Sequence, residues 1–204
     1  MSYGPWVILL AVVIYGVIHS LLASLWVKAR LRHWFGPGYE RWYRLVYNLI
    51  GVAALIPLLA LPALFESQTL YVIPYPWVIV TLLLQALAAL ALVVGLWQTD
   101  PLSFLGLRQL GGLPAEEPPR LVTGGLYRWV RHPLYTAGLV FIWLAPIMTV
   151  NLLVLNIGLT AYVIVGAYFE ERKLLREFGA AYAEYRQRTP MLVPGLQLLN
   201  KARR

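Results

Sequence analysis

"LYTAGLVFIWLAPIMTVNLLVLNIGLTAYVIVGAYF", residues 134–169, joins two apolar stretches with a single asparagine between them. A helix that crosses a membrane needs about 20 predominantly apolar residues. Leu134–Val150 and Leu152–Phe169 are each slightly shorter than this. Because only Asn151 separates the two stretches, we expect them to form a short helical hairpin in a membrane.

Three stretches upstream of this hairpin are long enough to cross a membrane: Pro5–Val27, Leu45–Phe65 and Trp77–Gln98. The first lacks a basic segment before it and a clear cleavage site, so we expect an anchor rather than a signal peptide. Pro57 and Pro62 should kink the second, since proline removes a helical N–H.

The composition supports a membrane protein. Of the 204 residues, 60% are hydrophobic and 13% are charged, whereas soluble domains are about 45–50% apolar with about a quarter charged residues. We therefore expect an all-α integral membrane protein with five transmembrane helices. It forms a single membrane domain over residues 1–204, with a three-helix N-terminal part (1–98) and a second part (99–204).

The basic residues indicate the orientation. All 17 Lys and Arg residues lie within residues 28–44, 108–131 and 172–204, and cytoplasmic loops are enriched in these residues. With five spans, the amino terminus is outside and the carboxyl terminus inside. The net charge of +8 then reflects topology and attraction to anionic lipid headgroups, and it does not indicate a nucleic-acid partner.

The segment "EERKLLREFGAAYAEYRQRTP", residues 170–190, follows the last span. Leu174, Phe178, Tyr182 and Tyr185 recur at helical spacing and share one face. We expect a cytoplasmic amphipathic helix that lies against the inner membrane surface or caps the bundle, and that Pro190 ends.

Several kinds of site are disfavoured by the residues present. The chain has no cysteine, and His19, His33 and His132 show no metal-binding spacing. Glycine-rich nucleotide-binding motifs are missing from the sequence as well. We expect no metal site.

Polar residues gather at the two ends of the predicted hairpin. Arg131, His132 and Tyr135 begin its first stretch, and Glu170 and Glu171 end its second. Since the two stretches are antiparallel neighbours, these side chains should lie at the same membrane level. A zwitterion with a ring system would use them all, with its carboxylate on arginine, its ammonium on glutamate and its cation against aromatic faces. S-adenosylmethionine has these properties.

A structural interpretation of the same residues stays open. Arg131 is also what a cytoplasmic membrane border carries, and Pro133 suits the first turn of a helix, where no N–H is needed. The two glutamates could simply be solvated. Tyr135 and Gly138, at i and i+3, favour a ligand because the glycine admits a molecule close to the backbone.

Two polar residues outside the hairpin are candidate site residues. His19 lies within the first span, where an ionisable group is a functional candidate, although a neighbour such as Asn48 or Gln85 could equally satisfy it. Asp100 follows the third span in "TDPLSF". It could contact a substrate or merely end the helix.

"GGLYRWVRHPLYTAG" and "FEERKLLREFGAAYAEYRQRTPMLVP" together resemble the integral-membrane methyltransferases, a superfamily that includes isoprenylcysteine carboxyl methyltransferases and phospholipid N-methyltransferases. The resemblance covers about the last 85 residues of the chain. The matching residues are Arg131, His132, Pro133, Tyr135, Gly138, Glu170, Glu171, Phe178, Gly179, Tyr182 and Tyr185. The front half, with "YGVIHSLLAS", "DPLSFLG" and "PIMTVNLL", is most similar to the methanethiol S-methyltransferase-like branch.

The resemblance implies that residues 99–204 form a cofactor-binding methyltransferase core for S-adenosylmethionine. The implied cofactor-binding residues are Gly125, Leu126, Tyr127, Arg131, His132, Pro133, Tyr135, Gly138, Glu170 and Glu171. As catalytic candidates we take Arg131, Glu170, His19 and Asp100. The expected location is the bacterial inner membrane, with the active site facing the cytoplasm.

The methyl acceptor stays open at this point. A small or lipophilic acceptor, either a thiol or a prenylcysteine carboxylate, is the first expectation. The alternatives are N-methylation of a phospholipid amine and a non-catalytic membrane protein that retains the fold. A small transporter or channel is disfavoured, since the outer half of the predicted bundle carries no charged residues.

Overall fold

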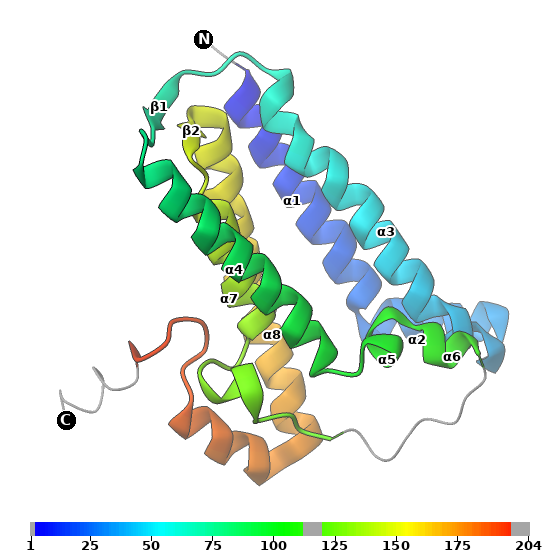
Figure 1. The fold of residues 1–204 in the computed structure, drawn as a ribbon. Coiled ribbons are helices and arrows are strands. Elements are labelled where there is room, and N and C mark those ends of the chain that lie inside the picture. Colours follow the sequence, from blue (N-terminus) through cyan, green and yellow to red (C-terminus); the bar gives the residue numbers. More distant parts are fainter. Residues whose placement is uncertain (1–2, 112–119, 197–204) are drawn as a thin grey trace. The chain divides into compact units, whose positions relative to one another are not determined.

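A computed structural model describes residues 3–111 and 120–196 (Figure 1). The helices are α1 (Gly4–Ala23), α2 (Leu25–Phe35), α3 (Glu40–Ala60), α4 (Trp77–Trp97), α5 (Pro101–Leu105), α6 (Leu107–Leu110), α7 (Pro133–Trp143) and α8 (Val150–Arg188). Short 3-10 turns cover Pro37–Tyr39, Leu61–Leu64 and Gly125–Arg128, and the strands β1 (Thr69–Val72) and β2 (Ile147–Thr149) pair with each other.

The chain forms two compact units, each built from separate stretches. Unit 1 comprises Met1–Tyr71, Asp100–Pro118 and Ile147–Tyr162, and unit 2 comprises Val72–Thr99, Pro119–Pro146 and Val163–Arg204. The helix α8 therefore contributes its first part to unit 1 and its remainder to unit 2.

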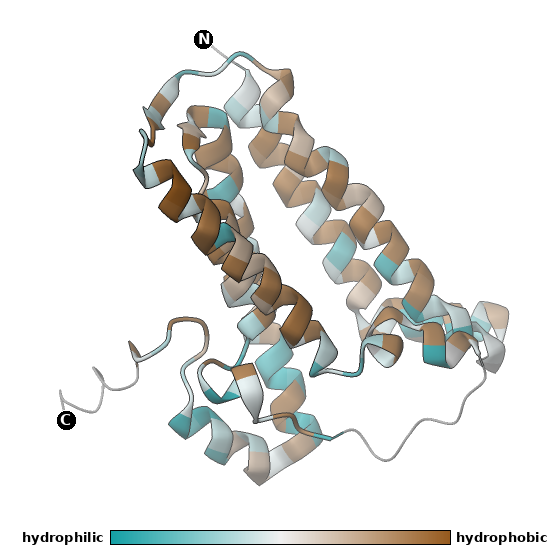
Figure 2. Ribbon diagram, viewed as in Figure 1, coloured by the Kyte–Doolittle hydropathy of each residue, from teal (hydrophilic) through white to brown (hydrophobic). Residues whose placement is uncertain are grey.

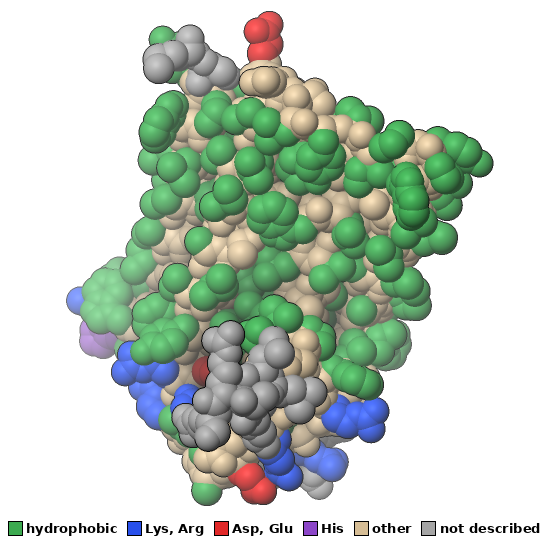
Figure 3. Space-filling view, turned by 90° about the vertical axis from the view of Figure 1, so that its left-hand side faces the viewer, with side chains coloured by type: hydrophobic (Ala, Val, Ile, Leu, Met, Phe, Trp, Pro, Cys, Tyr) green, Lys and Arg blue, Asp and Glu red, His purple; other side chains and the backbone are tan. Residues whose placement is uncertain are grey.

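The described residues contain four helices that are long and apolar enough to cross a membrane: Gly4–Ala23, Glu40–Leu64, Trp77–Trp97 and Val150–Arg188. Their apolar character is visible along α1, α3 and α4 in Figure 2, and hydrophobic side chains cover much of the face shown in Figure 3. A mostly helical membrane protein is thus confirmed. The number of spans and their orientation stay predictions.

In unit 1, α1 packs against α3, and α3 also contacts α5 and α6. The first apolar helix ends at Ala23, four residues earlier than predicted, because Ser24 takes an extended conformation and caps α2. Its hydroxyl oxygen accepts a hydrogen bond from the N–H of Val27 at 3.3 Å. Serine is a preferred N-cap, so one residue both ends α1 and begins α2.

The predicted prolines fall where the second apolar helix changes. Pro57 lies inside α3, and α3 gives way after Ala60 to the 3-10 turn that contains Pro62. Proline cannot donate the helical N–H bond. The end of this span is therefore a 3-10 turn, and a kink at Pro57 stays a prediction.

The hairpin differs from its prediction. The helix α7 stops at Trp143, and the strand Ile147–Thr149 replaces the predicted final turns. Pro146 explains this, because proline disfavours helical conformation in the residue before it and lacks an N–H. At 11 residues, α7 is about 16 Å long, which is shorter than the roughly 30 Å hydrocarbon core.

The second helix of the hairpin is longer than predicted. It runs from Val150 to Arg188, with a non-helical conformation at Gly179 (φ 53°, ψ −125°). Leu174 and Phe178 before this point are half-buried, while Tyr182 and Tyr185 after it are buried. The predicted face is therefore turned away from solvent, but a kink divides it, and its place on a membrane surface stays a prediction.

In unit 2, α4 packs along α7. Close packing is possible at Gly95, where an added Cβ would lie 3.0 Å from the side chain of Leu134. The amide of Gln85 also donates to the carbonyl of Phe141 at 2.9 Å. The first contact lies at the start of α7, where the candidate site is, and the second lies near the end of α7.

Candidate functional site

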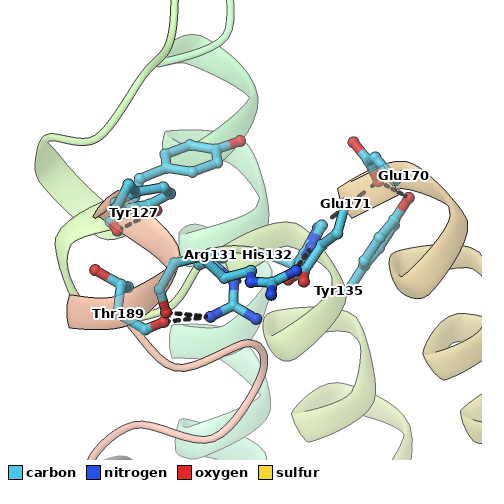
Figure 4. A network of polar contacts seen from close by, with 9 residues as sticks. Tyr127, Arg131, His132, Tyr135, Glu170, Glu171 and Thr189 are labelled. Carbon is cyan, nitrogen blue, oxygen red and sulfur yellow. Dashed lines mark hydrogen bonds and ion pairs between the residues drawn. The ribbon is translucent and has the colours of Figure 1, made fainter. Parts of the chain in front are cut away.

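A cluster of polar side chains surrounds the first turn of α7 in unit 2 (Figure 4). It draws on the residues before α7, on the middle and end of α8, and on the segment after α8. Within the described residues, no group of three or more His, Asp or Glu side chains is placed to hold a metal ion. The cluster is therefore one of opposite charges and hydroxyl groups.

The centre of the cluster is a buried ion pair. Nε of Arg131 lies 2.6 Å from Oε1 of Glu171, and both side chains are 9% exposed. Nη1 of Arg131 also donates to the backbone carbonyls of Arg186 and Thr189. The guanidinium thus ties α7 to both parts of α8, and among the described residues nothing accepts from its Nη2.

A second carboxylate lies nearer to solvent. The Glu170 side chain is 44% exposed, and its Oε2 accepts a hydrogen bond from the Tyr135 hydroxyl at 2.8 Å. The His132 ring is stacked on the Tyr135 ring with 5.3 Å between centroids. Nδ1 of His132 lies 3.7 Å from Glu170 and Nε2 lies 3.4 Å from Glu171. The imidazole is therefore held between two carboxylates.

The segment after α8 runs along the start of α7. The N–H groups of Arg131 and His132 donate to the carbonyls of Pro190 and Met191, at 2.9 and 3.2 Å. The hydroxyl of Thr136 donates to the carbonyl of Leu192 at 2.7 Å. Residues 190–192 therefore hold the backbone from which the site's basic side chains project.

The turn Gly125–Arg128 is anchored from two directions. Oε1 of Gln98, just after α4, accepts from the N–H of Leu126 at 3.1 Å, and the Tyr185 hydroxyl donates to the carbonyl of Tyr127 at 2.6 Å. These bonds occupy backbone groups at Leu126 and Tyr127. The role of Leu126 and Tyr127 in cofactor binding stays a prediction.

Gly125 is required for this turn. Its φ is +58°, and an added Cβ would lie 2.3 Å from the Gln98 amide. We expect Gly125→Ala to lower the free energy of unfolding by about 1–3 kcal/mol, measured by chemical unfolding in detergent. Gly124→Ala is the matched control, since Gly124 has a φ of −93° and an added Cβ there meets nothing within 4 Å. Equal losses for the two variants would contradict this account.

Two tyrosines at the cluster are suited to donate hydrogen bonds. Burial, and then the nearby Glu170, raise the pKa of Tyr127 to about 12, so its hydroxyl is neutral at physiological pH. The Tyr182 side chain is 1% exposed, and its hydroxyl has no hydrogen-bond partner among the described residues. A buried hydroxyl without a partner is costly, and Tyr182 therefore has a hydrogen-bond donor left to offer.

Gly138 is another predicted binding residue with free space beside it. No heavy atom lies within 4 Å of a Cβ added there. Pro133 opens α7 as predicted. The structure therefore leaves room beside the first turns of α7.

The candidate His19 lies in unit 1, where two tyrosine hydroxyls contact one of its ring nitrogens. Its Nδ1 lies 3.1 Å from the Tyr47 hydroxyl and 2.7 Å from the Tyr162 hydroxyl. The alternative in which a neighbour satisfies this histidine is supported, with these tyrosines in place of Asn48 or Gln85. A catalytic role for His19 stays a prediction.

The candidate Asp100 also belongs to unit 1 and has structural contacts. It caps the short α5 by accepting from the N–H of Ser103, and Arg108 lies 3.3 Å away. The hydrogen bond from Ser103 is the main reason why the pKa of Asp100 lies below its usual value. Asp100 therefore begins α5 and does not end the third span, since α4 stops at Trp97 with Gln98 as its C-cap; its catalytic role stays a prediction.

Sequence reasoning missed Gln98, Thr189 and the carbonyls of residues 190–192 as parts of the site. For Gln98 there was a signal, because a polar side chain closes an otherwise apolar helix. Backbone carbonyls leave no signal in a sequence, since every residue has one.

The comparisons with known proteins match the part of the chain that contains this cluster. A model of the phospholipid methyltransferase family matches residues 81–181, which include most of the cluster. The chain is 51% identical over 71 residues to methanethiol S-methyltransferase 2 of Bradyrhizobium diazoefficiens, covering 35% of this chain and 27% of that protein. It is 35% identical over 112 residues to methanethiol S-methyltransferase of Crocosphaera subtropica, covering 53% and 44%.

A third relative is protein-S-isoprenylcysteine O-methyltransferase B of Arabidopsis thaliana, 37% identical over 86 residues, covering 39% of this chain and 42% of that protein. No solved structure matches. Over the matched residues the chain is therefore similar to the integral-membrane methyltransferases. Two of the relatives described here are named methanethiol S-methyltransferases and one is named a protein-S-isoprenylcysteine O-methyltransferase. The matches span less than half of each relative's length.

Proposed function

We propose that the chain is an S-adenosylmethionine-dependent membrane methyltransferase that acts on a small or lipophilic acceptor, and that the acceptor is a thiol. The observation that carries the proposal is the cluster around Arg131, Glu170 and Glu171, with the buried, unpartnered hydroxyl of Tyr182 beside it. The names of the relatives in Bradyrhizobium and Crocosphaera support a thiol acceptor.

The residues of the cluster fit the proposed cofactor. Glu170, the more exposed carboxylate, would take the cofactor's ammonium group. Nη2 of Arg131 and the Tyr182 hydroxyl would take its carboxylate, and the open space beside Gly138 would admit its rings. When bound, S-adenosylmethionine would supply a methyl group on a positively charged sulfonium.

The chain's own contribution is alignment. In-line transfer depends on positioning, which can supply about 7–11 kcal/mol of the barrier. The Arg131–Glu171 pair and the carbonyls of residues 190–192 make the first turn of α7 rigid, so the binding groups are held in place before a ligand arrives. A thiol has an ordinary pKa of about 8.5, and a positive field from Arg131 would favour its reactive thiolate.

The test is transfer of labelled methyl from S-adenosylmethionine in membranes that contain the full chain. A small alkyl thiol, a prenylcysteine and an aminophospholipid would be offered separately. We expect the thiol to be methylated at least tenfold faster than the others. Faster methylation of the prenylcysteine or the aminolipid would reassign the acceptor.

A non-catalytic protein that retains the fold is the second candidate, since much of the cluster is internally bonded. Isothermal titration of the purified protein with S-adenosylmethionine separates the two. Neither heat nor a thermal shift at millimolar ligand, together with no methyl transfer to any acceptor, would favour the non-catalytic protein.

The placement of the site in the cell is part of the same proposal. The basic residues around Arg131 and after Phe169 support a cytoplasmic site in a bacterial inner membrane. Labelling of a cysteine introduced at exposed Glu184 by a membrane-impermeant reagent in intact and opened cells would test it. Labelling in intact cells would contradict the orientation.

A further inference from the structure

Unit 1 contains a cavity that lies between the apolar helices α1 and α3, which run side by side in Figure 1. Its volume is about 350 Å³, which is within the usual range of small-molecule sites. Aliphatic side chains, Gly51, Ala54 and Pro57 form most of its wall. The polar groups on the wall come from Tyr15 and His19.

The ring of His19 can offer a hydrogen-bond donor to this cavity. Two tyrosine hydroxyls, from Tyr47 and Tyr162, lie within hydrogen-bond distance of its Nδ1, and we assign both as donors to a lone pair on this nitrogen. The proton of the neutral ring then lies on Nε2. No described residue accepts a hydrogen bond from Nε2.

Gly51 positions this donor. An added Cβ at Gly51 would lie 3.3 Å from Cδ2 and 3.4 Å from Nε2 of His19, so the imidazole edge rests against the backbone of α3. The glycine thereby keeps Nε2 at the cavity wall. The His19 N–H and the Tyr15 hydroxyl, set among apolar side chains, match a ligand with an apolar body and one acceptor atom.

We propose that this cavity binds a neutral, long-chain carbonyl compound from the bilayer, with its carbonyl oxygen accepting a hydrogen bond from Nε2 of His19. A neutral head is required because the wall offers no charged partner, and an isolated charge in such surroundings is expensive. The apolar chain replaces hydrocarbon contacts that the lipid already provides, so selectivity rests on the one hydrogen bond. The proposal concerns unit 1 alone and does not depend on the proposed methyl transfer.

The experiment uses the full chain in lipid nanodiscs and two photoreactive probes of equal length. One probe is a diazirine-bearing long-chain ketone and the other is the corresponding alkane without the carbonyl. Labelled peptides from α1 and α3 are quantified by mass spectrometry. We expect the ketone to label them about fivefold more than the alkane, as one net hydrogen bond allows.

Variants identify the site of labelling. Ala54→Trp fills the cavity and should lower ketone labelling at least fivefold, whereas Ala53→Trp is the matched control, because the exposed Ala53 is not part of the wall. His19→Phe keeps an aromatic ring and should reduce the preference for the ketone to about one. Circular dichroism confirms that each variant is helical.

Equal labelling of wild-type protein by ketone and alkane would show that the cavity holds ordinary bilayer chains, which overturns the proposal. Equal losses in Ala54→Trp and Ala53→Trp would place the labelling elsewhere on α3 and overturn it as well.

Discussion

Replacement of Glu170 by glutamine should abolish most binding of S-adenosylmethionine while the fold stays intact. The carboxamide keeps an oxygen for the Tyr135 hydroxyl, so only the negative charge is lost. A hydrogen bond to a charged group contributes about 1.5–3 kcal/mol, which corresponds to roughly 10–150-fold in affinity. Titration calorimetry measures the affinity, and labelled methyl transfer measures the activity.

The matched control for this variant is Glu184→Gln. Glu184 lies on the same helix, is 67% exposed and pairs with Arg188 at 3.1 Å. Exposed pairs of this kind contribute little to stability, and Glu184 is not part of the cluster. If both variants lose affinity to the same extent, Glu170 has no specific contact with the ligand.

Removal of Arg131 should instead destabilise the protein. In Arg131→Met, the Glu171 carboxylate remains buried without its partner, and two backbone carbonyls lose their donor. Breaking a buried ion pair from one side typically costs about 3–5 kcal/mol. We expect a loss of that size in the free energy of unfolding, measured by chemical unfolding in a mild detergent.

Two further variants make this prediction specific. Arg131→Met combined with Glu171→Gln should recover a large part of the loss, since no buried charge is then left unpaired. Arg128→Met removes an exposed guanidinium that lies 5.5 Å from the centroid of the Trp129 ring, so it should change stability by less than about 1 kcal/mol. A loss in Arg128→Met equal to that in Arg131→Met would refute a special role for the pair.

The two predictions together separate residues that the sequence presents as equivalent. Glu170 and Glu171 are adjacent, and the sequence predicts the same kind of contact for both. The structure distinguishes them, because consecutive residues of an α-helix point in directions about 100° apart. Glu171 therefore lies against Arg131, and Glu170 lies beside the hydroxyl of Tyr135. Stability therefore depends chiefly on one carboxylate, and the proposed binding on the other.

Much of the fold could be predicted because the hydrocarbon core of a membrane requires spanning helices to be long and apolar. The helices α1, α3 and α4 lie where the apolar stretches predict them, and their ends differ by a few residues at capping positions such as Ser24. The strand Ile147–Thr149 was not predicted, since it depends on a distant partner, Thr69–Val72. Periodicity in one stretch carries no information about such pairing.

The same limit applies to the site. Charges at the two ends of the hairpin could be predicted to meet, and the structure brings Arg131 and Glu171 to 2.6 Å. The different roles of these charged residues could not be predicted, because they depend on contacts with the segment after α8 and with Gln98. The contacts of His19 with Tyr47 and Tyr162 were also beyond prediction, since they join three helices.

The contribution of Pro190, Met191 and Leu192 to the first turn of α7 has a consequence for biosynthesis. These carbonyls leave the ribosome after all the apolar helices have been made, so those helices are complete before the first turn of α7 gains its last hydrogen-bond acceptors. We expect a chain that terminates before Pro190 to keep its apolar helices and to lack the contacts that hold Arg131 and His132.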